Sequence, residues 1–261
     1  MDDKDVILRI KELSISYQSS GLSIFGNKRE IIAVNEVSLS VERGKTFAIV
    51  GESGSGKTSI AMSILGFVKP VSGSIEFNGL NLSSLKTGKQ RETRRLIQPV
   101  FQDANSALNP RMTVETSLLD SITSSDKIQR MKQVNSLLSS VGLSSDHMGK
   151  YPHELSGGQK QRLCIARALA PEPELLILDE PVSAQDLSIQ AQILSLLLEI
   201  KKAKNITYLL ISHDLNVVRI LADRVAVMRS GIIVEEASCE KFFSDPTHPY
   251  SQELIENSGI K

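Results

Sequence analysis

The sequence predicts an α/β fold in which a mostly parallel sheet is flanked by helices. The first observation is a strand, loop and helix in succession: the apolar run 46–50 leads into a glycine-rich loop, and helical periodicity follows over 59–65. The second and third observations are the runs 175–178 and 207–211, which are apolar without interruption. Uninterrupted apolar runs of strand length are typical of parallel strands that are buried on both faces.

Two further strands are expected ahead of the glycine-rich loop. Residues 6–17 alternate apolar and polar side chains, as a half-buried strand does, and residues 31–41 place several valines and a leucine on one face. The polar segment 18–30 between them is expected to be a loop. The sequence therefore predicts an N-terminal antiparallel β layer laid across the site that the glycine-rich loop forms.

The remaining elements follow from the same two periodicities. Short strands are expected at 74–77, 97–101, 225–228 and 232–235. Helices are expected at 86–95, from 157 to about 170, at 187–202, at 215–222 and at the C-terminus. Between 102 and 150 the apolar spacing is helical, which predicts an insertion of about fifty residues between two sheet strands, and long connections of this kind are often functional.

Composition limits what kind of protein this is. At 261 residues the chain is long enough for one large domain or two small ones. Its 30 basic and 30 acidic residues argue against a general polyanion binder, so no nucleic acid partner is expected. Cys164 and Cys239 form no metal or disulfide framework and indicate a reduced, cytosolic compartment. The charged N-terminus is not a signal peptide, and no apolar run approaches the length of a membrane span, so other chains would supply any membrane part.

The glycine-rich loop reads G-x-x-x-x-G-K-T, the pattern of a loop that cradles phosphates. Glycines permit a tight loop whose N–H groups point inward, and the next helix adds the positive end of its dipole. Lys57 is expected to reach the β- and γ-phosphates, and the Thr58 hydroxyl is expected to ligate Mg²⁺. A chance glycine-rich turn is the alternative, but the strand and helix that the motif requires are both present. The residues predicted to bind ATP here are Gly51, Ser53, Gly54, Ser55, Gly56, Lys57, Thr58 and Ser59.

A pair of acids follows the buried strand at 175–178. Asp179 is placed to hold Mg²⁺, and Glu180 is placed to orient or deprotonate the attacking water, because a strand end fixes a carboxylate in space. Two solvated acids that merely end a strand are the alternative interpretation. The pair predicts hydrolysis of the bound nucleotide.

The segment Leu155-Ser156-Gly157-Gly158-Gln159 decides among the phosphate-loop proteins. With the two motifs above, it makes the chain resemble the ATP-binding cassette (ABC) ATPases over nearly its whole length. The resemblance implies a single P-loop NTPase cassette over 1–261, with a nucleotide-binding core at 1–101 and 171–261 and a helical signature subdomain at 102–170. It also implies that Ser156, Gly157, Gly158 and Gln159 face an ATP bound by a second cassette, so that two ATPs lie between two subunits. A glycine-containing helix cap is the structural alternative.

Other positions of the family's pattern are present. The resemblance places Gln102 where a glutamine reaches the Mg²⁺ and water, and His213 where a histidine contacts the γ-phosphate. Tyr17 matches the aromatic residue that stacks on adenine, with a core tyrosine as the alternative. Gln185 replaces an apolar residue in the segment 183–186 at the dimer seam, which puts the tightness of communication between cassettes in doubt. His147, His153 and His248 are interpreted as structural.

Two stretches resemble the importers of oligopeptides, dipeptides and nickel. They are the F-Q-x-x-x-x-x-L-N-P-R run at 101–111 and the D-P-T-H-P-Y run at 245–250. The absence of a cysteine-bearing tail and the run 161–164 favour nickel or a metal chelate modestly over peptides. The resemblance implies a membrane-associated ATPase at the cytoplasmic face of the membrane. Its expected partners are a second ABC ATPase (the same chain or a paralogue), two transmembrane permease subunits and an extracytoplasmic substrate-binding protein.

Cassette proteins outside transport share the three motifs. DNA-repair and chromosome-associated ATPases separate them with coiled-coil or zinc-binding inserts, which do not fit between Lys57 and Ser156 here. Translation-factor-like proteins carry two cassettes in one chain, and exporter halves carry fused membrane helices. An importer ATPase is therefore the function that the sequence predicts.

Overall fold

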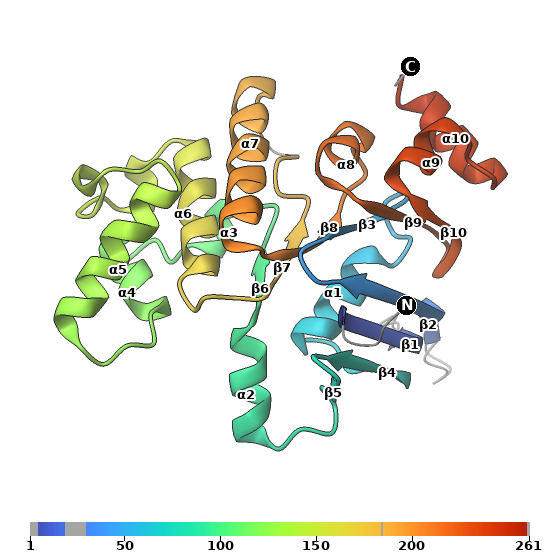
Figure 1. Cartoon of the computed structure of the whole chain (residues 1–261), viewed down its shortest axis with the longest axis horizontal. Coiled ribbons are helices and arrows are strands. Elements are labelled where there is room, and N and C mark those ends of the chain that lie inside the picture. Colours follow the sequence, from blue (N-terminus) through green and yellow to red (C-terminus); the bar gives the residue numbers. More distant parts are fainter. Residues whose placement is uncertain (1–4, 19–29, 184, 260–261) are drawn as a thin grey trace, which may run out of the picture. The chain divides into compact units, whose positions relative to one another are not determined.

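The computed structural model describes residues 5–18, 30–183 and 185–259 of the chain. The chain divides into two compact units, one formed by Met1–Arg91 with Leu209–Lys261 and the other by Glu92–Tyr208. Figure 1 labels the helices and strands along the sequence. The acidic N-terminus, the predicted loop between Gln18 and Glu30, and Ala184 of the segment 183–186 lie outside the described residues.

The first unit contains an antiparallel sheet of four strands in the order β2-β1-β4-β5. Ile10 of β1 is paired with Leu39 of β2 on one side and with Ile75 of β4 on the other. All three side chains are buried, because the alternating pattern turns one face of each strand inward. The predicted N-terminal antiparallel layer is thereby confirmed and gains two strands; its members are β1 (Val6–Gln18), β2 (Glu30–Glu42), β4 (Ser72–Phe77) and β5 (Leu80–Asn81).

A second sheet in the same unit holds the strand that leads into the glycine-rich loop. β3 (Thr46–Val50) pairs in parallel with β9 (Arg224–Arg229), and β10 (Ile232–Ser238) pairs antiparallel with β9 on the far side. All five residues of β3 are buried, as its apolar composition predicts. The helices of this unit are α1 (Lys57–Leu65), α8 (Leu215–Leu221), α9 (Cys239–Ser244) and α10 (Pro249–Asn257).

The second unit contains two parallel strands and most of the helices. β6 (Ile97–Val100) and β7 (Leu175–Asp179) run in parallel, with Val100 opposite Leu178. The connection between them is helical, as its periodicity predicts, and includes two short 3₁₀ turns. The helices are α3 (Ala104–Ala107), α4 (Val114–Ser121), α5 (Lys127–Ser140), α6 (Gly157–Leu169) and α7 (Leu187–Lys204). Two elements contain the boundaries between the units, α2 (Thr87–Arg95) and β8 (Thr207–Ile211).

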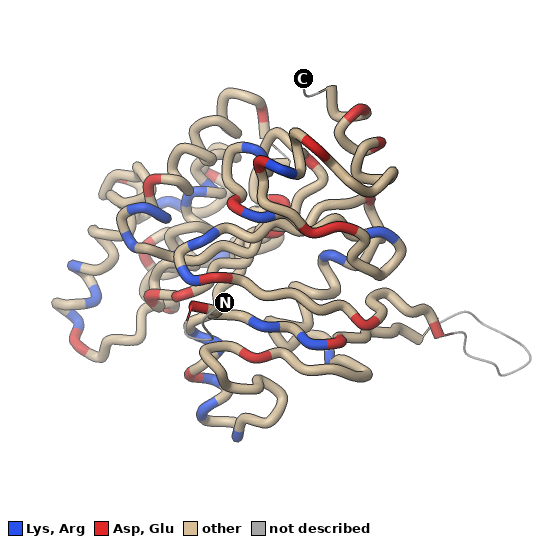
Figure 2. The backbone as a smooth tube through the Cα atoms, turned by 45° about the vertical axis from the view of Figure 1, so that its right-hand side comes forward, with Lys and Arg blue, Asp and Glu red and all other residues tan. Residues whose placement is uncertain are grey.

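The structure confirms the α/β class, with bounds within a few residues of those predicted. The predicted signature subdomain, 102–170, falls inside the second unit, which also contains β6, β7 and α7. In the part of the chain that the structure describes, no helix is both long enough and apolar enough to cross a bilayer. Basic and acidic residues are interspersed along the described part of the chain, in keeping with the balanced charge (Figure 2).

Candidate active site

The glycine-rich loop is packed tightly on its inner side. A Cβ atom at Gly51 would overlap the carbonyl oxygen of Met228 on β9, and one at Gly56 would overlap the carbonyl oxygen of Ala33 on β2. Both glycines have positive φ, +147° and +108°, which residues with side chains rarely adopt. The backbone of the loop can approach its neighbours this closely only because these two positions carry no side chain.

The outer side of the same loop is open. Gly54, at φ +82°, would place a Cβ where no atom lies within 4 Å, and Glu52 and Ser53 are exposed. The loop ends at Gly56, the N-cap of α1, and the first N–H groups of this helix have no partner within the helix. An open loop of backbone donors at a helix N-terminus fits a polyphosphate.

Lys57 holds the loop together from inside. Its Nζ donates to the carbonyl oxygens of Gly51 and Glu52, both at 2.7 Å, and to Ser55 Oγ at 3.3 Å. The side chain is 6% exposed, so these acceptors replace the water that the ammonium group gives up. The next residue, Thr58, is exposed. Lys57 therefore brings a positive charge to the loop, and Thr58 brings an accessible hydroxyl.

Tyr17 lies near the start of α1 and is not a core residue. Its hydroxyl donates to Ser59 Oγ at 3.1 Å, and 40% of the residue is exposed. The exposure removes the alternative of a buried core tyrosine. Stacking of Tyr17 on adenine stays a prediction. Ser59, which is also predicted to contact the nucleotide, accepts the hydrogen bond from Tyr17.

His213 lies at the carboxyl end of β8, beside the strand that leads into the loop. The backbone N–H of Ser212 donates to the carbonyl oxygen of Ile49 at 3.3 Å, two residues before Gly51. The next residue, Asp214, caps α8 by accepting from the N–H of Asn216, which fixes the turn. His213 is exposed, so its imidazole is accessible at the end of the sheet from which the phosphate loop extends.

In the second unit, the two predicted carboxylates and Gln102 follow paired parallel strands. Asp179 ends β7, and Gln102 follows β6, so the three side chains start from the same edge of the strand pair. Glu180 has φ +49°, a conformation that costs a residue with a Cβ free energy and that is concentrated at functional sites. Asp179 and Glu180 are partly exposed, and Gln102 is exposed.

Gln161 on α6 ties these two strand ends together. Its side-chain amide donates to the carbonyl oxygen of Pro181 at 2.9 Å and to that of Phe101 at 3.5 Å. The residue is fully buried, so it fixes the backbone next to Glu180 and the backbone next to Gln102. Sequence reasoning missed this supporting role, since nothing in the spacing of Gln161 distinguishes it from a surface glutamine of the same helix.

The predicted signature segment forms the N-terminus of α6. Ser156 is the N-cap: its Oγ accepts from the N–H of Gln159, and its own N–H donates to Gln159 Oε1 at 3.0 Å. Gln159 also contacts His147 Nε2 at 3.2 Å, so its side chain serves to hold the helix start. Ser156 and Gly157 are exposed. The helix therefore presents its first N–H groups and the Ser156 hydroxyl on an accessible surface.

The two signature glycines allow close packing on α7 and on the segment before it. A Cβ at Gly157 would lie 3.1 Å from Gln185 Oε1, and one at Gly158 would lie 2.9 Å from a methyl carbon of Ile189. Gln185, which departs from the family's usual apolar residue, thus has its amide beside the signature. An alanine at Gly158 would force a shift against Ile189, whereas one at Gly157 would require only a small movement of the Gln185 side chain.

Residues 34–183, more than half of the chain, match the ABC transporter family. The chain belongs to this family. It is 41% identical over 254 residues to the oligopeptide transport ATP-binding protein OppF of Streptococcus pyogenes serotype M1, which covers 95% of this chain and 80% of the relative. It is also 41% identical over 263 residues to the dipeptide transport ATP-binding protein DppF of Lactococcus lactis subsp. cremoris, covering 98% and 82%.

Solved structures agree with this assignment. The dimeric ATP-binding cassette MJ0796 in a post-hydrolysis state bound to ADP and Pi superposes with a TM-score of 0.77 at 28% identity, covering 89% of this chain and 99% of that one. CbiO1 from Clostridium perfringens, part of the ABC transporter complex cbiONQ, gives 0.78 at 29% identity, covering 98% and 96%. As an ABC ATPase, the chain binds and hydrolyses ATP, and it couples hydrolysis to transport.

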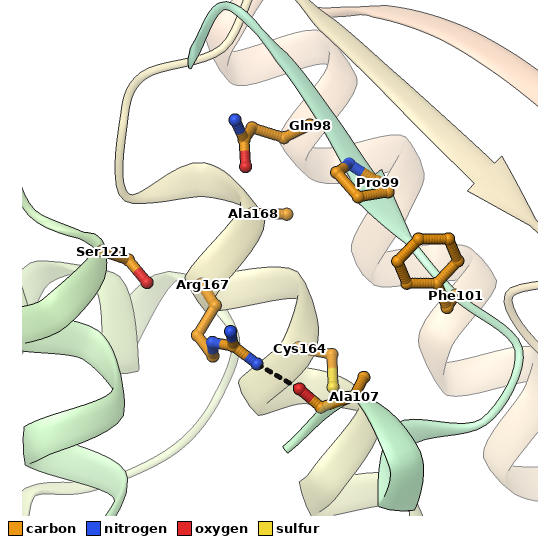
Figure 3. A pocket seen from close by; sticks show the side chains of 8 residues that line it. All are labelled: Gln98, Pro99, Phe101, Ala107, Ser121, Cys164, Arg167 and Ala168. Carbon is orange, nitrogen blue, oxygen red and sulfur yellow. Dashed lines mark hydrogen bonds between the residues drawn. The ribbon is translucent and has the colours of Figure 1, made fainter. Parts of the chain in front are cut away.

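The ABC signature helix also forms one wall of a cavity of about 160 Å³ in the second unit (Figure 3). Arg167 lines the cavity and donates to the carbonyl oxygen of Ala107 at 2.6 Å. Cys164 lies beside it, and burial raises the pKa of its thiol to about 11, so the sulfur is an unreactive packing group. The lining comes from β6, α3, α4 and α6: Gln98, Pro99, Phe101, Ala107, Ser121, Cys164, Arg167 and Ala168.

The remaining histidines have structural contacts, as predicted. His147 bonds Ser144 and Gln159, His153 stacks on Tyr151 with ring centroids 5.7 Å apart, and His248 caps α10. Over the described ranges, no three histidine, cysteine or acidic residues gather as metal ligands would.

Replacing Ser156 with alanine is expected to lower stability and ATPase activity together. The lost N-cap costs about 1 kcal/mol of unfolding free energy, which thermal unfolding would measure. Ser156→Asp is the matched control, because aspartate also caps helices but repels a phosphate. We expect Ser156→Asp to restore the melting temperature while hydrolysis stays low. Recovery of hydrolysis in Ser156→Asp would show that the cap is the whole role of Ser156.

Proposed function

We propose that this chain is the ATP-hydrolysing, nucleotide-binding subunit of an ABC importer that carries peptides across the cytoplasmic membrane. The observation that carries the proposal is the 41% identity, over nearly all of the chain, to subunits named for oligopeptide and dipeptide transport. These names support peptides over nickel or a metal chelate. The choice of cargo rests on these relatives.

The phosphate loop is proposed to hold the triphosphate of ATP. Its open outer side supplies backbone donors, Lys57 supplies the charge, and Tyr17 supplies a ring for adenine. Thr58, Asp179 and Gln102 would hold Mg²⁺, which prefers oxygen ligands of this kind, and all three are at least partly exposed. When bound, Mg²⁺ neutralises the charge that develops on the transferred phosphoryl group.

Hydrolysis is assigned to side chains at the ends of strands. Glu180 would accept the proton of the attacking water, and His213 would contact the γ-phosphate. Two observations support this role, because a general base must be held in one geometry. Glu180 has a strained backbone, and the carbonyl oxygen of the next residue, Pro181, accepts a hydrogen bond from Gln161. The accessible N-terminus of the signature helix would bind the γ-phosphate of an ATP held by a second ABC ATPase, either the same chain or a paralogue.

The partners proposed for the chain are those of an importer. Two permease subunits would span the membrane, the chain would lie at its cytoplasmic face, and an extracytoplasmic protein would deliver the peptide. The cavity beside Arg167 and Phe101 is a candidate seat for a side chain of a short permease helix, because it adjoins both Gln102 and the signature helix. Movement of such a helix would shift the two segments of the second unit that are proposed to contact nucleotide, the Gln102 segment and the signature helix.

Uptake by cells that lack the gene tests the proposal. We expect deletion to lower uptake of a radiolabelled tripeptide and pentapeptide, and to leave ⁶³Ni²⁺ uptake unchanged. Wild-type protein supplied in trans should restore peptide uptake, and Lys57→Ala should not. Loss of ⁶³Ni²⁺ uptake with normal peptide uptake would overturn the peptide assignment, and rescue by Lys57→Ala would overturn the role of ATP.

A further inference from the structure

The peptide group between Gly51 and Glu52 is held at both of its ends. Its carbonyl oxygen, that of Gly51, accepts from Lys57 Nζ at 2.7 Å. Its N–H, that of Glu52, donates to the hydroxyl oxygen of Tyr250 at 3.1 Å. A trans peptide is planar and points its C=O and N–H in opposite directions, so the two contacts together fix how the plane is turned.

This peptide group needs an external restraint. Gly51 has no side chain to limit rotation on the N-terminal side of the peptide, and the outer side of the loop is open to solvent. Turning the plane over would move the Gly51 carbonyl away from the Lys57 ammonium group. The hydroxyl of Tyr250 opposes that rotation, because the Glu52 N–H would have to give up its acceptor.

Tyr250 is itself immobilised. It is 2% exposed on α10, and the guanidinium carbon of Arg229 lies 4.6 Å from the centroid of its ring. Arg229 follows Met228, whose carbonyl oxygen abuts Gly51, so the end of β9 supports both the loop and the tyrosine. His248 Nδ1 accepts from the N–H of Tyr250 at 3.1 Å and fixes the first turn of α10.

A buried carboxylate anchors the segment before Tyr250 to the sheet. Glu235 on β10 accepts from the N–H groups of Thr247 and His248, both at 2.9 Å, and is 8% exposed. Burial by itself would raise the pKa of this carboxyl, but hydrogen bonds including these two outweigh it and hold the pKa below its usual value. Glu235 is therefore ionised at neutral pH, and it keeps α10 on the sheet that carries the phosphate loop.

We propose that Tyr250 is a positioning residue for ATP binding, which acts through the Gly51–Glu52 peptide to hold the Lys57 ammonium group where the phosphates need it. The inference rests on the proposed phosphate-binding role of the loop. The inference assigns the D-P-T-H-P-Y segment at 245–250 a structural role at the nucleotide site, whereas the sequence pattern identifies this segment only as typical of a subfamily. All of the contacts that carry it lie within the first unit.

The test compares two conservative changes, Tyr250→Phe and Tyr208→Phe. Both tyrosines are buried, and both hydroxyls bond the main chain; Tyr208 donates to the carbonyl oxygen of Leu197 at 2.8 Å, in the second unit. Each variant loses one hydroxyl and keeps its ring. Dissociation constants for the fluorescent nucleotide mant-ATP, KM and kcat for ATP, and melting temperatures are measured for both variants and the wild type.

We expect Tyr250→Phe to weaken mant-ATP binding and raise KM by about threefold to tenfold, as loss of one hydrogen bond does. Its kcat at saturating ATP should stay within about twofold of wild type, because a bound triphosphate then orders the loop. Tyr208→Phe should lower the melting temperature and leave mant-ATP affinity unchanged. Hydrogen exchange is a second measurement: the Glu52 amide should be protected in the wild type and exchange faster in Tyr250→Phe alone.

Two results would overturn the inference. One is wild-type affinity in Tyr250→Phe with unchanged protection of the Glu52 amide. The other is an equal loss of mant-ATP affinity in Tyr250→Phe and Tyr208→Phe, which would indicate that losing any buried hydroxyl destabilises the fold and weakens binding. Failure of the wild-type protein to bind mant-ATP is a different result, because it would contradict the proposed function of the loop itself.

Discussion

Replacing Glu180 with glutamine is expected to slow ATP hydrolysis by about a hundredfold or more and to leave ATP binding intact. A general base contributes this much, and glutamine keeps the shape of the side chain without accepting a proton. The proposed function implies that ATP binding closes a pair of cassettes and hydrolysis reopens it, so the variant should stay dimeric in Mg-ATP and be monomeric without it. Light scattering of the purified variant with and without Mg-ATP measures this directly.

Glu172→Gln is the matched control for Glu180→Gln. Glu172 also has a left-handed backbone, with φ +55° against +49° for Glu180, but it is exposed in the turn that follows α6. The control should hydrolyse ATP at the wild-type rate and dissociate after turnover. A Glu180→Gln monomer that binds ATP would indicate a paralogous partner chain, and wild-type hydrolysis by Glu180→Gln would contradict the assignment of the base.

Local pattern was enough to predict the elements of this fold. The strand at 46–50 and the helix after it were predicted because apolar periodicity and the glycine motif both act within a dozen residues. The same holds for Asp179 at the end of β7 and for Ser156 at the start of α6, where the cap and the helix form one local unit. Their positions on the elements follow from the chain itself, and their chemical roles stay predictions.

Contacts between distant parts of the chain were not predictable in this way. Tyr250 bonds Glu52 across 198 positions of sequence, and Gln161 bonds Phe101 across 60. A tyrosine in a short polar segment and a glutamine on a helix carry no periodic signal that would reveal such partners. These two residues fix the backbone beside the predicted catalytic groups, so sequence reasoning proposed the reacting side chains and missed the residues that support them.

The Gln185 position illustrates the difference between a motif and its geometry. Sequence comparison with the family pattern registers only that an apolar residue has become polar. In the structure, the amide of Gln185 lies close to Gly157 at the start of the signature helix. The departure therefore concerns contact with the signature segment, which is the surface proposed to receive the second cassette's ATP.

Replacing Gly51 with alanine is expected to cost about 3 kcal/mol or more of unfolding free energy, because the new Cβ would overlap the carbonyl oxygen of Met228 and the φ of +147° disfavours a side chain. Neither obstacle can relax easily, since β3 and β9 are paired buried strands. The displaced Gly51 carbonyl would also withdraw one of the acceptors of Lys57. Urea denaturation of the nucleotide-free protein measures the loss.

Gly54→Ala is a control for the Gly51→Ala change, because it introduces a side chain at a positive φ without a steric overlap. Its φ of +82° also disfavours a side chain, but its Cβ would meet nothing within 4 Å. Only the cost of the left-handed backbone, about 1–2 kcal/mol, should therefore appear in its unfolding free energy. Equal losses in the two variants would mean that the contact between the loop and β9 contributes nothing beyond conformation. A larger loss in Gly51→Ala is the expected result, because overlap with β9 and the withdrawn acceptor of Lys57 add to the conformational cost there.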